Sequence, residues 1–185
     1  ALDHYQDRTE VWSISGYMYP VVLDETYRWD SLLYRRFSCW GWATWADRWS
    51  RVGWNVPDRS DFLGRRGLLG RMSEAANDLP EIMLDLIDRR NDSWSILFNY
   101  SQVQAGGFSV HPVRTLARNT GFDGTGTHTR ADAGFRQVPL QDPAGARQFR
   151  FADAYDAALV RPLDAYFANR PVRKLKNLLQ YGRWF

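Results

Sequence analysis

The chain has 185 residues, of which 44% are hydrophobic and 24% charged. These values fit one globular domain and exclude collagen, coiled coils and wholesale disorder. The net charge of +3 is far below that of a dedicated nucleic-acid binder, so we expect no nucleic-acid partner. A single cysteine, Cys39, excludes an internal disulfide and a cysteine-rich zinc site.

The first half of the chain contains short predicted elements. Residues 11–16 alternate between apolar and polar side chains, which predicts a half-buried strand. A loop rich in Tyr and Pro follows, to about Tyr34. Residues 43–52 can form a short helix that ends at Gly53, and residues 80–90 have the apolar spacing of another helix.

The clearest predicted element is a helix over residues 92–105. Asp92 is a suitable N-cap, and Gly106 and Gly107 supply a C-cap. Apolar residues occupy more than half of its circumference, so we expect the helix to be deeply buried.

The remaining elements mix strands and helices. Residues 108–111 and 114–117 are expected to form short strands, and residues 119–129 a glycine-rich loop. Residues 153–169 and 172–179 are predicted to be helical. This mixture indicates an α/β or α+β class.

Five of the nine tryptophans lie between Trp40 and Trp54. Trp42, Trp45 and Trp49 have the spacing of a helical stripe, and Trp40 precedes them across Gly41. One interpretation is an aromatic core cluster. The other is a platform on which sugar rings stack, with Gly41 allowing the backbone to approach the ligand closely.

Two further sites each allow a structural and a chemical interpretation. Asp92 could cap the helix that it precedes, or it could act as a general base held ready for an incoming hydroxyl. His128 lies in the loop of residues 121–129 with Asp123, where an imidazole could bind a divalent metal, although one histidine does not define a metal site. His111, before Pro112, is expected to be structural.

The last segment, residues 172–185, is basic and partly amphipathic. Leu175, Leu178 and Leu179 share one face of the expected helix. Docking of this helix on its own domain is the favoured interpretation. Peripheral contact with an anionic membrane is the alternative.

The ordered motifs VWSISGY, SCWGWATWADRW, NDSW and LARNTGFDGTGTHT resemble the C-terminal half of GT-A fold glycosyltransferases, and more closely bacterial sugar transferases related to family 2. The resemblance covers about residues 1–129. It implies an α/β fold that forms the C-terminal part of a Rossmann-like GT-A domain. Residues 1–129 would be the acceptor-side half, and residues 130–185 a C-terminal helical extension.

The same resemblance implies roles for particular residues. Asp92 matches the catalytic base, and His128 matches a metal-binding histidine. The following residues are expected to bind substrate: Trp40, Gly41, Trp42, Trp45, Trp94 and Asp123.

The implied reaction is transfer of a sugar from a nucleotide-sugar donor to a hydroxyl of a carbohydrate acceptor, in cell-surface polysaccharide or glycoconjugate synthesis. The complete enzyme would use a divalent metal, Mn or Mg, and would be cytoplasmic or peripheral to the inner face of the membrane. The chain has no Asp-x-Asp motif, and Asn91 stands where the family has Glu. We therefore expect an incomplete donor site here. The alternative functions are a non-catalytic carbohydrate-binding module and a structural domain with tryptophans in its core.

Overall fold

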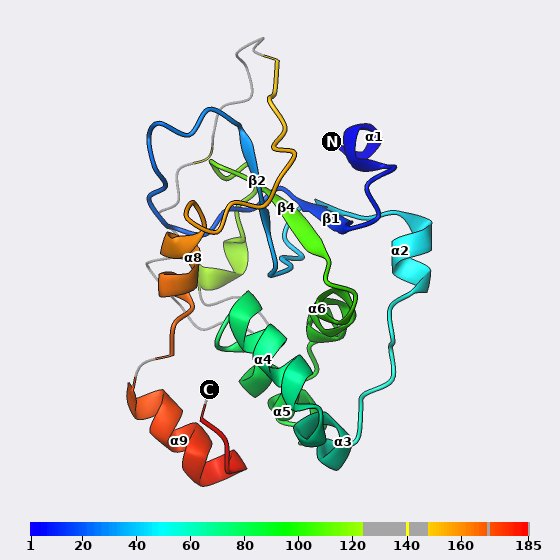
Figure 1. The fold of residues 1–185 in the computed structure, drawn as a ribbon, viewed down its shortest axis with the longest axis vertical. Helices are drawn as coiled ribbons and strands as arrows, with labels where there is room; N and C mark the ends of the chain where they lie inside the picture. The colour runs from blue at the N-terminus through cyan, green and yellow to red at the C-terminus, as the bar shows by residue number, and fades with distance from the viewer. Residues whose placement is uncertain (124–139, 141–147, 170, 185) are drawn as a thin grey trace.

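A small mixed sheet organises the upper part of the molecule in Figure 1. The computed structural model describes residues 1–123, 140, 148–169 and 171–184. The strands have the order β2-β4-β1-β3, and they are β1 (Val11–Ser15), β2 (Ser31–Tyr34), β3 (Trp42–Ala43) and β4 (Phe108–Pro112). β1 runs parallel to β4, while β2 and β3 pair antiparallel with their neighbours. The fold is therefore α/β, as predicted.

The central strands are buried along most of their length. β1 and β4 match the strands predicted from the sequence. All four residues of β2 are buried. This strand was not predicted, because its sequence, SLLY, does not alternate between apolar and polar side chains. Burial on both faces is typical of strands covered by other elements on each side.

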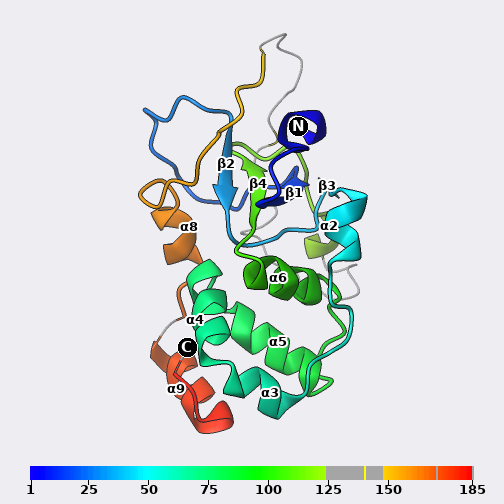
Figure 2. The ribbon, with the colours of Figure 1, turned by 45° about the vertical axis from the view of Figure 1, so that its right-hand side comes forward.

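Helices cover the sheet and form a layer below it (Figures 1 and 2). They are α1 (Leu2–Tyr5), α2 (Ala46–Ser50), α3 (Arg59–Gly64), α4 (Arg66–Ala75), α5 (Leu79–Ile87), α6 (Ser95–Gln104), α8 (Arg161–Tyr166) and α9 (Pro171–Tyr181). Residues of α3, α4, α5 and α6 share one hydrophobic core. α6 lies between this core and the sheet, and eight consecutive residues of it, Ile96 to Val103, are buried, which confirms the predicted deep burial.

The end of α6 confirms the predicted glycine cap. Gly106 has a φ of 69°, a conformation that glycine adopts without strain. Its N–H donates to the Val103 carbonyl at 3.1 Å, and the Gly107 N–H donates to the Gln102 carbonyl at 2.8 Å. These two bonds define a Schellman motif.

The start of α6 corrects the prediction. The helix begins at Ser95 after the N-cap Trp94, so Asp92 is not its N-cap. Instead, the Asn91 Oδ1 accepts a hydrogen bond from the Ser93 N–H at 3.1 Å. This Asx-turn holds the chain in a non-helical conformation around Asp92.

Three other predicted elements differ from the observed ones. The helix expected over 43–52 is shorter than predicted and corresponds to α2. It starts later because Trp42 and Ala43 pair with β1. Residues 114–117 form no strand; there the Thr115 hydroxyl bonds the backbone of Met18 and Ala117. The helix expected over 153–169 is reduced to α8.

The C-terminal part packs directly against the sheet. The Ala152 N–H donates to the Ser31 Oγ at 2.9 Å, and the Tyr5 hydroxyl donates to the Ala152 carbonyl at 2.7 Å. Val160 and Leu163 lie in one cluster with residues of β2. In the described part of the chain, none of the helices is both long and apolar enough to cross a membrane.

Candidate functional site

The three tryptophans expected to form one helical stripe do not form it, because Trp42 belongs to a strand. Trp42 and Trp49 still meet, with ring centroids 6.1 Å apart, whereas Trp45 lies elsewhere. Four indoles gather beside the start of α6, and we call them the indole cluster: Trp42, Trp49, Trp54 and Trp94. The ring centroids of Trp42 and Trp94 are 5.7 Å apart, and those of Trp49 and Trp54 are 4.4 Å apart.

The indole cluster has a buried base and an exposed surface. Trp42 packs on the buried Phe37 and Phe98, with centroid distances of 4.8 and 5.4 Å. The exposed fractions of the other three indoles are 42% for Trp49, 38% for Trp54 and 43% for Trp94. Rigid aromatic faces that are partly open to solvent are suited to stacking against a flat ligand ring.

Trp49 and Trp54 were not among the predicted substrate-binding residues. The sequence signal that could have included them was the density of tryptophan between residues 40 and 54. That density does not tell which indoles are exposed, since exposure depends on the packing of the chain around them.

A cavity of about 360 Å³ lies beside the start of α6. The loop after β2, the start of α5 and the start of α6 line it, including Arg36, Cys39, Trp40, Asp78, Ser93 and Asn99. This volume is within the range of roughly 300–1,000 Å³ that small-molecule pockets occupy. Trp40 therefore lines a cavity, and it is not part of the indole cluster.

Buried amides of α6 position the loop that lines this cavity. Asn99 forms two hydrogen bonds with the backbone of Phe37. One turn later, the Gln102 Nε2 donates to the Arg35 carbonyl at 2.9 Å, and its Oε1 accepts a bond from the Ser109 hydroxyl at 3.0 Å. The exit of β2 is thus held to α6 and β4 by side chains, because no strand neighbour satisfies its polar groups there.

An ion pair stands at one wall of the cavity. The Arg36 Nη1 lies 2.5 Å from the Asp78 Oδ1, and both side chains are largely buried. The guanidinium also lies 4.1 Å from the centroid of the Phe167 ring and donates to the Tyr19 hydroxyl. Burial lowers the pKa of Arg36, but the contacts with Asp78 and Tyr19 raise it by more. The net pKa is above its ordinary value, so the guanidinium stays charged.

Cys39 also lines the cavity, but it is not an activated nucleophile. Burial raises the pKa of its thiol, and a hydrogen bond with the Ser95 side chain offsets part of that effect. Because the thiolate is the reactive form, a raised pKa leaves Cys39 as an unreactive thiol near neutral pH.

Asp92 is followed in the sequence by one residue of the cavity and then by one residue of the indole cluster. Ser93 lines the cavity, whereas Trp94 belongs to the cluster. Asn91 fixes the turn, since its Nδ2 donates to the Ile82 carbonyl at 3.0 Å and its Oδ1 closes the Asx-turn. Asp92 is exposed at this turn. We call the group of Asp92, Ser93 and Trp94 the Asp92 junction.

Gly41 and Trp45 are placed by structural contacts. Gly41 has a φ of 57°, its carbonyl accepts the Gly16 N–H at 2.7 Å, and an added Cβ would lie 2.9 Å from the Ala117 Cβ. Its close approach is therefore to the protein's own chain. Trp45 packs under the Arg48 guanidinium at 4.7 Å and against a core on the other side of the sheet from the indole cluster's base.

The predicted metal ligand His128 and the predicted substrate-binding residue Asp123 lie beyond and at the edge of the described chain. Asp123 ends a short 3-10 helix, Thr120–Asp123, and its side chain is outside the description. His128 lies outside the described residues. Within the ranges that are described, no three His, Cys, Asp or Glu side chains are grouped to hold a metal. These residues therefore do not supply a ligand set for Mn or Mg.

His111 is buried and structural, as expected. Its Nδ1 lies 2.9 Å from the Tyr17 carbonyl oxygen, and its Nε2 lies 3.0 Å from that of Arg36. Burial lowers the pKa of the ring, although both backbone contacts act in the opposite direction. A neutral imidazole can donate to only one of the two carbonyls.

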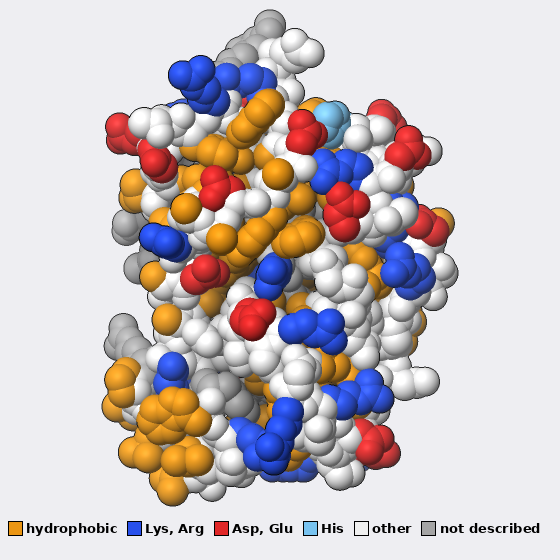
Figure 3. Space-filling view, in the orientation of Figure 1, with side chains coloured by type: hydrophobic (Ala, Val, Ile, Leu, Met, Phe, Trp, Pro, Cys, Tyr) orange, Lys and Arg blue, Asp and Glu red, His pale blue; other side chains and the backbone are white. Residues whose placement is uncertain are grey.

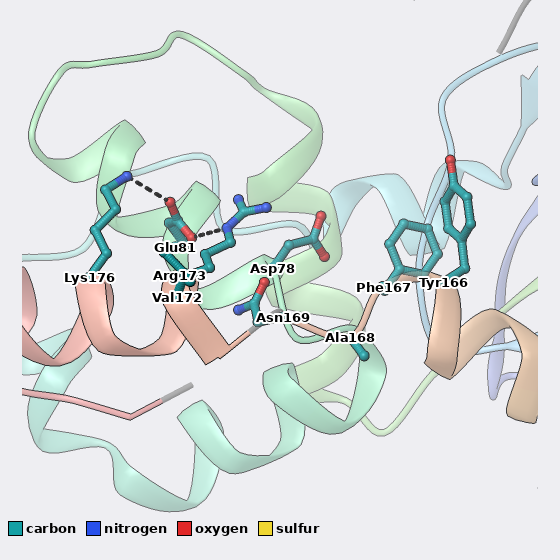
Figure 4. A pocket seen from close by; sticks show the side chains of 9 residues that line it. All are labelled: Asp78, Glu81, Tyr166, Phe167, Ala168, Asn169, Val172, Arg173 and Lys176. Carbon is teal, nitrogen blue, oxygen red and sulfur yellow. Dashed lines mark hydrogen bonds and ion pairs between the residues drawn. The ribbon is translucent and has the colours of Figure 1, made fainter. Parts of the chain in front are cut away.

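A larger pocket of about 790 Å³ lies between α5, α8 and α9 and shares Asp78 and Phe167 with the cavity (Figure 4). At its centre, Glu81 is 2.6 Å from the Arg173 Nε and 3.4 Å from the Lys176 Nζ. Glu81 thus pairs with two cations, and none of the predicted site residues lines this pocket. The Asp92 junction is therefore the better candidate site.

Comparison with known proteins adds no assignment: no protein-family model, no curated protein and no solved structure matches the chain. Function is therefore inferred from the motifs and from the geometry of the Asp92 junction.

Proposed function

We propose that this chain is the acceptor-side part of a GT-A glycosyltransferase that transfers a sugar from a nucleotide-sugar donor to a carbohydrate hydroxyl. The observation that carries the proposal is the position of Asp92. It is an exposed residue on a turn that Asn91 fixes, and in the sequence it comes directly before Ser93, which lines the cavity, and Trp94, a half-exposed indole of the cluster.

The indole cluster supports a carbohydrate acceptor. Trp49 and Trp54, from one short stretch of the chain, and Trp94, 40 residues later, offer partly exposed aromatic faces. Burial of aromatic surface against the apolar face of a sugar ring contributes binding energy without requiring a charged group. The exposed side of the cluster would hold the acceptor so that one of its hydroxyls reaches Asp92.

Asp92 supplies the proton acceptor. The acceptor oxygen forms a bond to the anomeric carbon of the donor sugar, and the bond from that carbon to the nucleoside diphosphate breaks. The hydroxyl proton passes to the Asp92 carboxylate, and the diphosphate leaves with the bonding electron pair. Such general-base catalysis contributes roughly two to four orders of magnitude to a rate.

The test is an Asp92→Asn variant of the complete protein that carries this chain. Release of nucleoside diphosphate is measured with a panel of uridine- and guanosine-diphosphate sugars and a carbohydrate acceptor. We expect folding to be retained and turnover to fall by about two to four orders of magnitude. Asp3→Asn, the same change at an exposed residue of α1, is the matched control and should leave turnover unchanged. Near-normal turnover by Asp92→Asn excludes the base assignment.

The exposed indoles also support a second candidate, a non-catalytic carbohydrate-binding module, since binding requires only aromatic faces. The two candidates differ in one measurable respect. A binding module would retain carbohydrate affinity but release no nucleoside diphosphate with any donor, and Asp92→Asn would then change neither property.

A further inference from the structure

Helix α9 is attached to the protein by its polar side. The residues of this helix that are buried are Asn177 and Tyr181, which lie one turn apart on the same face. Arg173 and Lys176 bind the Glu81 carboxylate of α5. The Tyr181 hydroxyl lies 3.2 Å from the Asp85 Oδ1 and accepts a bond from Arg90 at 2.6 Å.

The aliphatic residues of α9 are exposed to solvent, although Val172 also lines the pocket between α5, α8 and α9. Their exposed fractions are 80% for Val172, 51% for Leu175, 42% for Leu178 and 80% for Leu179, and Trp184 after the helix is 59% exposed. Figure 3 shows hydrophobic side chains gathered over α9 at the lower left. Docking of the helix on its own domain is thus observed, but not through the leucine face that the sequence indicated.

The charge along this segment has one sign. Between Pro171 and Trp184 the sequence contains four basic residues, Arg173, Lys174, Lys176 and Arg183, and no acidic one. Glu81 balances Arg173 and Lys176 only in part, because one carboxylate faces two cations. An exposed aliphatic row next to basic side chains has the composition of a helix that lies in a membrane interface.

We propose that the exposed face of α9, defined by Val172, Leu175, Leu178, Leu179 and Trp184, binds the surface of an anionic lipid bilayer. The aliphatic side chains enter the boundary between headgroups and acyl chains, and the basic residues contact the anionic headgroups. This inference does not depend on the proposed function, because none of these residues lines the Asp92 junction.

A second copy of the chain fits this face less well. Pairing two such faces would bring two basic segments together, which is unfavourable. An 11-residue helix is about 16 Å long and about 10 Å wide. It therefore offers much less than the roughly 800 Å² per partner that stable interfaces bury.

The test uses the 185-residue chain and two kinds of vesicle, pure phosphatidylcholine and phosphatidylcholine mixed with phosphatidylglycerol. Cosedimentation should show binding to the anionic vesicles that weakens as salt is added. Val172→Ser combined with Leu179→Ser should reduce this binding by more than about tenfold, because both side chains lose their apolar contact. Lys174→Ala should reduce it by about fivefold.

The matched control combines Val22→Ser with Leu116→Ser, which removes one exposed valine and one exposed leucine from other segments. It should bind as the unchanged chain does. Absence of binding to anionic vesicles, equal binding to neutral vesicles, or full binding by the α9 variant would each overturn the proposal. So would a dimer in sedimentation velocity that the same α9 variant dissociates.

Discussion

The side chain of Asn99 and the backbone of Phe37 are joined by two hydrogen bonds. The Asn99 Oδ1 accepts from the Phe37 N–H at 2.9 Å, and the Asn99 Nδ2 donates to the Phe37 carbonyl at 3.3 Å. A single buried amide thereby replaces the strand partner that Phe37 lacks. It also fixes the loop with Cys39 and Trp40 against α6 and so sets the shape of the cavity.

Asn99→Ala should destabilise the protein by about 2–4 kcal/mol, because it leaves two buried backbone groups of Phe37 without a partner. Urea unfolding followed by circular dichroism measures this change. Gln104→Ala, at an exposed position of the same helix, serves as the control and should alter stability by less than about 0.5 kcal/mol. A similarly small effect for Asn99→Ala would show that the paired hydrogen bonds do not hold the loop.

Asn91→Ala should impair turnover through the position of Asp92. The substitution removes the bond to Ile82 and opens the Asx-turn, so the carboxylate is no longer held at the junction. We expect kcat to fall more than KM changes, together with a stability loss of about 1–2 kcal/mol. Steady-state kinetics of the proposed transfer reaction provides the readout, and an unchanged kcat would contradict a positioning role for Asn91.

Trp94→Ala should weaken carbohydrate binding with little loss of stability, because Trp94 is an exposed member of the indole cluster. Affinity electrophoresis in gels that contain bacterial capsular polysaccharides measures the binding. Trp45→Ala removes an indole that lies outside the cluster and should leave the affinity unchanged. Equal effects of the two substitutions would argue against the cluster as the acceptor platform.

Stability should decrease as the pH falls from about 7 to about 5, partly because of His111. Burial lowers the pKa of its ring in the folded protein, whereas the unfolded chain titrates near about 6.5. The unfolded state therefore binds more protons in this range, and protonation favours unfolding. Thermal melting at several pH values should show a smaller slope for His111→Asn than for the unchanged protein. A slope that does not change would show that His111 does not titrate differently on folding.

Local sequence determined the elements whose signals lie within a few residues. The alternation of residues 11–15 was sufficient for β1, and the paired glycines after residue 105 were sufficient for the end of α6. The apolar residues around α6 correctly predicted its burial. In each case the physical cause is local, since backbone geometry and side-chain periodicity act over one or two turns.

Only the tertiary structure decided the arrangement of the candidate site. Trp42 became a strand residue because Ala43 pairs with Ile14, which lies 29 positions earlier in the chain. α6 begins at Ser95 after the N-cap Trp94, and Asn91 bonds to α5 and closes the turn before it. The sequence by itself determined the density of tryptophan between residues 40 and 54 and the position of Asp92 shortly before α6. Which indoles remain exposed, and which faces of α6 and α9 are covered, depends on contacts between residues far apart in the chain, and these contacts exist only after the chain has folded.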